Sequence, residues 1–151
     1  QIAKRTFHLG WDEKYGGLLR FVDREGGAPR GDCIGTPYEE LVKDTWDMKL
    51  WWPHTEMLIA ALMLYRDTGE KRYAEWFARA WDYSMAVFPD REYGEWYGYL
   101  RRDGKPTEPA CKGSTFKGPF HYPRMLMMVD QMLGDLLDRE EGGYEDGSGS
   151  N

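Results

Sequence analysis

The chain has 151 residues, which is enough for one domain with a hydrophobic core but not for two ordinary domains. Acidic residues outnumber basic ones, 26 to 20, and the resulting net charge of −6 argues against nucleic acid or an anionic membrane as the main partner. No apolar run approaches the ~18 residues of a membrane span, and no signal peptide opens the chain. The two cysteines, Cys33 and Cys111, are too few for a disulfide framework, so we expect a soluble cytoplasmic protein.

The first part of the chain is predicted to be mostly irregular. Residues 1–7 read like the end of a helix whose beginning is missing. Turn clusters at 10–17 and 24–27 flank residues 18–23, whose composition favours a strand. After a stretch with Gly and Pro but no periodicity, residues 38–43 favour a single helical turn.

Three later segments carry apolar residues at helical spacing. Residues 51–66 have a proline in the first turn and a glycine after the end, at Gly69, so a helix is predicted there. A second helix is predicted over 73–88, ending before Pro89. The last helix carries apolar residues up to Leu137.

Turn residues separate these helices from one another. Residues 93–100 and the turn at 102–105 predict a β-hairpin, and a loop over 105–119 leads to the last helix. We expect the body of the protein to comprise residues 1–139. Residues 140–151 are rich in Gly and Ser and have little to bury, so a flexible tail is predicted.

Two internal repeats indicate the architecture. Residues 12–26 match residues 90–104 at a constant offset of 78 positions (Asp12 to Asp90), and residues 49–58 match residues 117–126 at an offset of 68. The repeated unit is therefore a hairpin, a loop, a helix and a partner helix. Such units stack into a solenoid or close into a ring whose loops line a pocket, but this chain holds too few units to close a ring.

The second of these repeats contains the best candidate for chemistry. Residues 117–124 run from a Gly-containing loop into a helix, with a proline suited to the first turn. His121 is then expected at the helix start, where the dipole favours the neutral imidazole that a general base needs. Arg124 follows three residues later, roughly on the same face. The alternative is that His121 is only a cap or a surface residue.

Three motifs resemble the C-terminal part of the N-acylglucosamine 2-epimerase family. They are Trp46–Glu56, Glu92–Leu100 and Phe116–Arg124, and the resemblance covers about residues 8–138. It implies an all-α fold, an (α/α)6 barrel or toroid of which this chain holds roughly the C-terminal third, with short β-hairpin insertions. It also implies inversion at C2 of an open-chain amino sugar or hexose by proton removal and return.

The resemblance further implies roles for particular residues. His121 and Glu56 match catalytic positions of the family, and four residues are expected at the substrate: Arg124, His54, Trp52 and Lys117. No metal and no cofactor are implied, although a nucleotide activator is possible in this family. A homodimer is expected, as is a need for the missing N-terminal part of the barrel, which supplies the second histidine.

Other interpretations stay open at this point. The chain is alternatively a non-catalytic sugar-binding or protein-interaction module of the same fold. An (α/α)6 glycoside hydrolase or lyase would need paired carboxylates, and only Glu56 is well placed. Glu56 is alternatively an acid in a first helical turn, where the dipole favours it. The repeat predicts that Glu56, His121 and Arg124 share one pocket on neighbouring helices.

Overall fold

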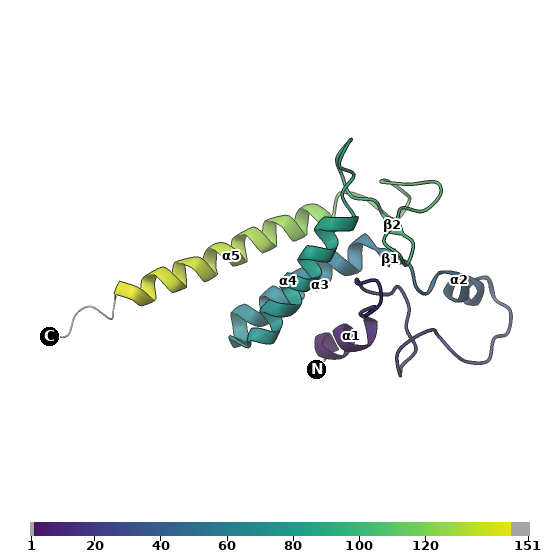
Figure 1. Cartoon of the computed structure of the whole chain (residues 1–151), viewed down its shortest axis with the longest axis horizontal. Helices are drawn as coiled ribbons and strands as arrows, with labels where there is room; N and C mark the ends of the chain where they lie inside the picture. The colour runs from purple at the N-terminus through teal and green to yellow at the C-terminus, as the bar shows by residue number, and fades with distance from the viewer. Residues whose placement is uncertain (1, 146–151) are drawn as a thin grey trace.

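Helices dominate the structure, a computed structural model that describes residues 2–145, with side chains described as far as residue 139 (Figure 1). The elements of this part are α1 (Ile2–Gly10), α2 (Pro37–Thr45), β1 (Lys49–Leu50), α3 (Trp51–Thr68), α4 (Lys71–Val87), β2 (Tyr99–Leu100) and α5 (His121–Glu145). Helices are therefore confirmed in the three segments with helical periodicity. No helix among these residues is long and apolar enough to cross a membrane.

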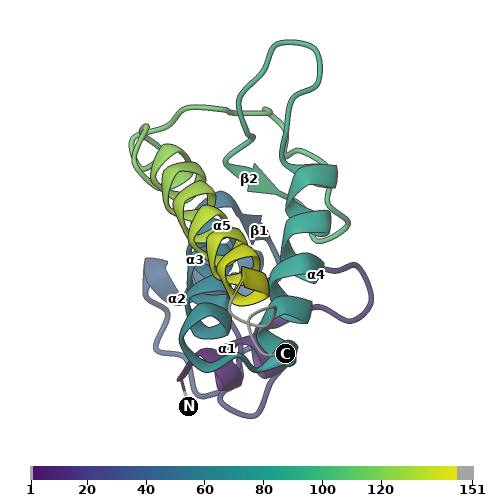
Figure 2. The ribbon, with the colours of Figure 1, turned by 90° about the vertical axis from the view of Figure 1, so that its left-hand side faces the viewer.

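Helix α3 is the centre of the arrangement and packs against α4, α5 and, less extensively, α1 (Figures 1 and 2). Its buried residues recur every three to four positions over the first three turns, as a helix between two neighbours requires. They are Trp51, His54, Thr55, Leu58, Ile59, Ala61 and Leu62. The helix ends at Gly69, whose left-handed φ of 69° lets its N–H donate to the Tyr65 carbonyl at 2.8 Å.

Helix α5 begins at His121, with Pro123 in its first turn, as predicted. Met125, Val129 and Met132 form its buried face at helical spacing. The C-terminal half extends beyond the ends of α3 and α4 (Figure 1). The helix continues to Glu145, so the start of the predicted tail at residue 140 lies within α5, and residues 146–151 lie outside the described part of the chain.

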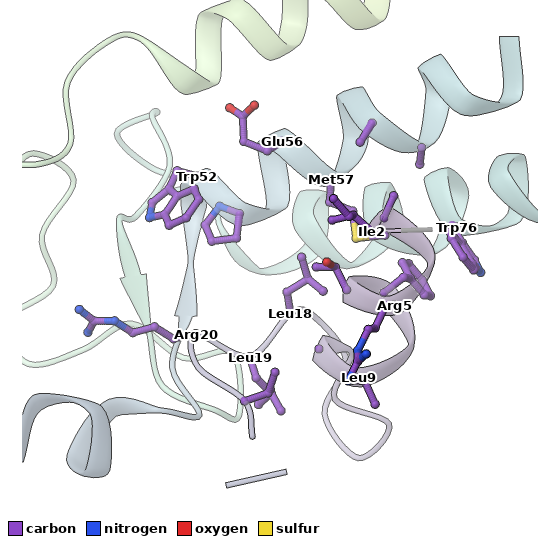
Figure 3. A pocket seen from close by; sticks show the side chains of 18 of the residues that line it. Ile2, Arg5, Leu9, Leu18, Leu19, Arg20, Trp52, Glu56, Met57 and Trp76 are labelled. Atoms are coloured by element: carbon purple, nitrogen blue, oxygen red, sulfur yellow. The ribbon is translucent and has the colours of Figure 1, made fainter. Parts of the chain in front are cut away.

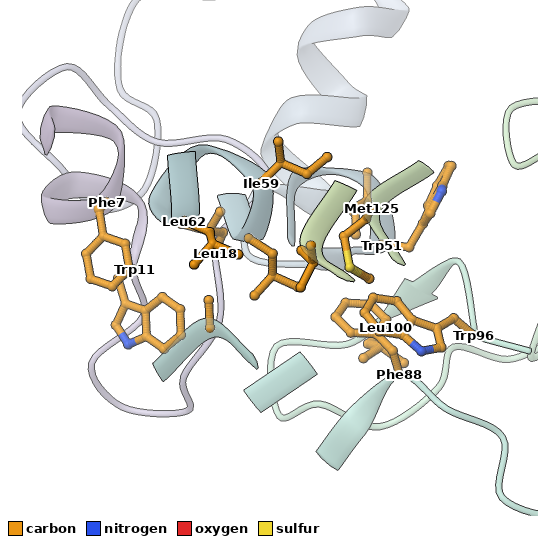
Figure 4. Packing of buried hydrophobic residues seen from close by; sticks show 14 of the residues in the cluster. Phe7, Trp11, Leu18, Trp51, Ile59, Leu62, Phe88, Trp96, Leu100 and Met125 are labelled. Carbon is orange, nitrogen blue, oxygen red and sulfur yellow. The ribbon is translucent and has the colours of Figure 1, made fainter. Parts of the chain in front are cut away.

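Aromatic rings form much of the hydrophobic core, as Figure 4 shows. Phe7 of α1 stacks on Trp76 of α4 with ring centroids 4.4 Å apart, and Phe88 stacks on Trp96 at 5.1 Å. The first contact joins α1 to α4, and the second joins the C-terminal cap of α4 to the loop that follows it. Much of the high aromatic content is thus used in packing, although Trp52, Phe116 and Phe120 stay exposed.

The repeated loops adopt the same backbone hydrogen bonds. Asp12 N–H donates to the Gly17 carbonyl, and the equivalent Asp90 N–H donates to the Glu95 carbonyl, both at 2.9 Å. Each loop is also closed by a single antiparallel bridge, Trp11 with Leu18 in one case and the equivalent pair in the other. The offset of 78 residues therefore reflects a true structural repeat.

Three local predictions need correction. Residues 18–23 form no strand; Arg20 and Phe21 instead donate backbone N–H groups to carbonyls at residues 46–48. The predicted single turn at 38–43 is the longer helix α2, because Thr36 and Glu39 form a capping box that stabilises it.

The predicted hairpin at 93–105 is also mostly wrong. Its turn is present, with Arg101 N–H donating to the Lys105 carbonyl, but only a single bridge links Leu100 to Pro106. Strand β2 pairs instead with β1, far away in the sequence, so that Lys49 lies opposite Leu100. Strand pairing between distant segments has therefore replaced the pairing expected within the hairpin. Strand β1 leads directly into the central helix α3, so this pairing also fixes β2 beside the start of that helix.

Candidate active site

Glu56 and His121 meet where the N-terminal turns of α3 and α5 pack together. The Glu56 Oε1 and His121 Nδ1 atoms are 2.7 Å apart. Both side chains are about one-third exposed, so the pair is supported by the protein but open to a ligand. The predicted proximity of Glu56 and His121 is confirmed, since the N-terminal parts of the two repeated helices lie side by side.

The partner of Nδ1 determines which ring nitrogen is free. An ionised carboxylate only accepts hydrogen bonds, so Nδ1 of His121 carries the proton and donates it to Glu56. The other nitrogen, Nε2, is then unprotonated in the neutral ring and can accept a proton. Glu56 therefore orients the imidazole and fixes the tautomer that a general base needs.

Arg124 completes the cluster from the next turn of α5. Its Nη2 atom donates to the same Oε1 atom of Glu56 that His121 contacts. The guanidinium also lies over the ring of Phe120, 4.6 Å from its centroid. Since a guanidinium has five N–H donors, others remain for an oxygen of a ligand.

Two tryptophans flank His121 and differ in their exposure. Trp51 is buried, and its ring meets the His121 ring edge-on at 6.4 Å, so it supports the histidine from the core. Trp52 is 43% exposed with its ring 6.0 Å from that of His121. An exposed indole face can stack on a sugar ring, and the substrate contact expected for Trp52 stays a prediction.

His54 does not belong to this site. It has no exposed surface, its Nε2 accepts the Leu18 N–H at 2.9 Å, and its Nδ1 contacts the Leu50 carbonyl at 2.6 Å. Burial lowers the pKa of His54 to about 4, so the ring stays neutral. The expected substrate contact is therefore not supported, and His54 instead joins the first loop to α3.

Lys117 is also directed away from solvent. Its side chain is 4% exposed, and Nζ lies 3.0 Å from Oε1 of Glu95. The expected direct contact with substrate is not supported, because the buried ammonium group is already paired with Glu95, whose side chain is about half exposed. Glu95 was not among the predicted site residues, although the repeat aligns it with Gly17 and so marks a position where the second loop has a side chain and the first has none.

An apolar groove of about 910 Å³ lies beside the cluster, between α1, residues 18–24 and the outer face of α3. Figure 3 shows Trp52 and Glu56 at one end of this groove and Ile2, Met57 and Trp76 towards the other. The Glu56 carboxylate points away from α1, towards the side where α5 lies. Among the described side chains, no group of three or more His, Cys, Asp or Glu residues could hold a metal ion.

Known proteins resemble the chain over most of its length. The family model for N-acylglucosamine 2-epimerase (GlcNAc 2-epimerase) matches residues 1–117. The N-acylglucosamine 2-epimerase of Rattus norvegicus is 47% identical over 133 residues, which is 88% of this chain and 29% of the relative. The Homo sapiens enzyme of the same name is 46% identical and is covered to 28%.

Solved structures support the same fold. A crystal structure of D-mannose isomerase matches 83% of this chain and 28% of its own, with a TM-score of 0.65 and 22% identity. The structure of cellobiose 2-epimerase from Spirochaeta thermophila matches 63% of this chain and 24% of its own, with a TM-score of 0.57 and 26% identity. The fold is therefore part of an (α/α)6 barrel, and this chain spans less than a third of the curated relatives' length. It belongs to the N-acylglucosamine 2-epimerase family.

Proposed function

We propose that the whole protein is a sugar 2-epimerase that interconverts N-acylglucosamine and N-acylmannosamine, with His121 as one of its two acid–base groups. The single observation that carries the proposal is the 2.7 Å contact between His121 Nδ1 and Glu56, which leaves Nε2 free as a base. The 46–47% identity to proteins named N-acylglucosamine 2-epimerase favours this substrate class over others.

The proposed reaction begins with the open-chain sugar. Nε2 of His121 takes the hydrogen at C2 as a proton, the electron pair forms a C1–C2 double bond, and the C1 carbonyl oxygen becomes an oxyanion. Return of a proton to the opposite face of C2 gives the epimer. No oxidant or reductant is needed, because the two sugars have the same composition.

Glu56 and Arg124 have separate parts in this scheme. Glu56 is the partner of the imidazolium that forms when His121 is protonated, so its negative charge stabilises that state. Arg124 is held against Glu56 and has N–H groups left over, which could donate to the developing oxyanion. Trp52 would provide an apolar face for the sugar.

A second base has to come from outside this chain. Inversion needs a proton donor on the opposite face of the sugar, and the remaining histidines do not qualify: His54 is buried with both nitrogens in use, and His8 does not line the groove beside the cluster. We therefore propose that another part of the barrel supplies it. The apolar groove between α1 and α3 is the surface on which those helices would pack, since an open apolar groove of this size is costly in water.

The proposal also covers the location, oligomeric state and cofactor needs of the protein. A cytoplasmic location fits the unpaired, exposed Cys33 and Cys111. A homodimer, the absence of a cofactor and activation by a nucleotide stay predictions from the family. The competing proposal, a sugar-binding module without activity, would keep Trp52 and the groove but would not require the Glu56–His121 contact.

Deuterium exchange tests the proposal. The whole protein, incubated with N-acylglucosamine in deuterated water, is expected to form N-acylmannosamine that carries deuterium at C2, as measured by NMR. Binding without exchange or product would overturn it in favour of the non-catalytic module. Product that keeps the original hydrogen at C2 would contradict a mechanism in which a histidine exchanges this proton with solvent. Cleavage of a glycoside, supplied in a separate assay in place of the free sugar, would support the hydrolase alternative.

A further inference from the structure

Glu95 has an unusual backbone conformation in the second repeated loop. Its φ is 65°, and it is the sole non-glycine residue with positive φ in the described part of the chain. The equivalent residue of the first loop is Gly17, with φ of 74°. Residues other than glycine are disfavoured at positive φ, so a glutamate at this position requires an explanation.

The two loops differ in what surrounds this position. A Cβ atom at Gly17 would lie 2.3 Å from a ring carbon of Tyr83, so no side chain fits in the first loop. In the second loop the Glu95 carboxylate accepts the Trp96 N–H at 2.8 Å and the Lys117 ammonium at 3.0 Å. These two hydrogen bonds compensate for the backbone strain.

Lys117 has a counterpart in the repeat as well. The equivalent Lys49 donates to the Gly17 carbonyl and to Asp12 in the first loop. The lysine of each repeat therefore contacts the same position of its loop, through a backbone carbonyl in one case and through a side-chain carboxylate in the other. Glu95 thus replaces a backbone contact with an ionic one.

This contact lies next to the start of α5. Lys117 precedes His121 by four residues, and Tyr122 follows His121 directly. Trp96, the neighbour of Glu95, packs against Tyr122 with ring centroids 4.6 Å apart. Glu95 and Trp96 therefore hold the chain on both sides of the histidine.

We propose that Glu95 is a positioning residue for the reaction, acting through Lys117 to place His121 in contact with Glu56. The inference rests on the proposed function of His121. Burial acts to raise the pKa of Glu95, but the hydrogen bonds from Trp96 and Lys117 outweigh it and lower the pKa, so the carboxylate is ionised and pairs with the lysine.

Three variants of the whole protein test the proposal: Glu95→Gly, Glu95→Gln and Lys117→Met. Glycine suits the positive φ at this position and removes the whole side chain, whereas glutamine keeps the length and an acceptor oxygen but not the charge. Glu92→Gln is the matched control, because Glu92 is an exposed residue of the same loop. With N-acylglucosamine as substrate, Glu95→Gly and Lys117→Met are expected to lower kcat about 10- to 100-fold with KM changed only a few-fold.

The kcat of Glu95→Gln is expected to lie between the values of the wild type and of Glu95→Gly. The double variant of residues 95 and 117 is expected to lose no more of its kcat than either single variant does. A second measurement does not depend on activity. Proton–nitrogen NMR of the His121 ring is expected to show protonated Nδ1 in the wild type and a mixture of tautomers in Glu95→Gly.

The outcomes separate the two ideas. Absence of turnover by the wild-type protein would contradict the proposed function. The His121 tautomer in Glu95→Gly would still show whether Glu95 positions the histidine. Unchanged kcat and an unchanged tautomer in both Glu95→Gly and Lys117→Met would overturn the positioning role. Global unfolding of Glu95→Gly, seen by circular dichroism, would also overturn it, because the proposal assigns Glu95 a local effect.

Discussion

Glu56 and His121 are 65 positions apart in the sequence, yet their side chains meet at 2.7 Å. The contact joins the second turn of α3 to the first residue of α5, in two helices that repeat the same sequence motif. Because Glu56 also binds Arg124, one carboxylate oxygen organises both a base and a cation. The arrangement supports an acid–base role for the histidine and makes the following predictions testable.

Replacing His121 by Asn is expected to lower turnover of N-acylglucosamine by the whole protein by ~10²–10⁴-fold. Asn forms hydrogen bonds but cannot take up a proton near neutral pH, so the fold and much of the sugar binding should persist. Exchange of the C2 hydrogen with deuterated water should be lost from at least one epimer. His8→Asn, on the exposed side of α1, is the control with normal activity. Survival of both turnover and exchange within a few-fold would make His121 structural.

Replacing Glu56 by Gln is expected to lower kcat by about 10²-fold, because the imidazolium and Arg124 both lose their negative partner. KM should change less, since the side chain keeps its size and an acceptor oxygen. Steady-state kinetics give both constants. Glu75→Gln on the exposed face of α4 is the matched control. A rise in KM with unchanged kcat would instead mean that Glu56 only binds substrate.

His54 should make the protein less stable in mild acid. Burial lowers its pKa from 6.5 to about 4, so between these values the unfolded state binds a proton that the folded state does not. Stability is therefore complete above about pH 6.5 and falls, by up to ~3 kcal/mol, as the pH drops towards 4. Urea unfolding at several pH values measures this loss.

The contribution of His54 is isolated by comparison with His54→Gln. That variant should be less stable than the wild type at pH 7.5 but should lose less stability on acidification, because the titrating group is gone. His8→Asn should show the wild-type slope, since His8 is exposed. An identical pH dependence in wild type and His54→Gln would contradict the assignment.

Lys49→Met is expected to destabilise the protein by about 3 kcal/mol. Lys49 and Asp12 are both buried and 3.0 Å apart, so removing the cation leaves a buried carboxylate with Arg102 as its remaining side-chain partner. Chemical denaturation measures the change. Lys43→Met, at an exposed position of α2, should stay within ~0.5 kcal/mol of wild type. Equal effects of the two variants would show that the buried Lys49–Asp12 pair does not contribute to the free energy of unfolding.

Gly17→Ala should destabilise the protein far more than Gly27→Ala. Both glycines have a left-handed backbone, with φ of 74° and 79°, and so share a conformational cost of about 1 kcal/mol. At Gly17 the added Cβ would also meet Tyr83 at 2.3 Å, whereas nothing lies within 4 Å of one at Gly27. Overpacking adds ~1–3 kcal/mol, measured as a larger drop in Tm. Equal Tm values for the two variants would contradict the close contact.

The sequence predicted the helices and the cluster well because their signals are local and repeated. The apolar periodicity located α3, α4 and the start of α5, and the offset of 68 residues alone placed Glu56 and Arg124 at equivalent positions of two helices. Motif resemblance then indicated the family, and the match of the family model to residues 1–117 confirms it.

Only the tertiary structure decided which polar residues of the motifs are exposed and which are buried and paired. His54 and Lys117 belong to the same motifs as Glu56 and His121, but the first is enclosed by Leu18 and Leu50 and the second is paired with Glu95. The strand at residues 99–100 likewise pairs with residues 49–50 instead of with its neighbour. Burial and pairing depend on residues distant in the sequence, so periodicity and spacing alone could not reveal them.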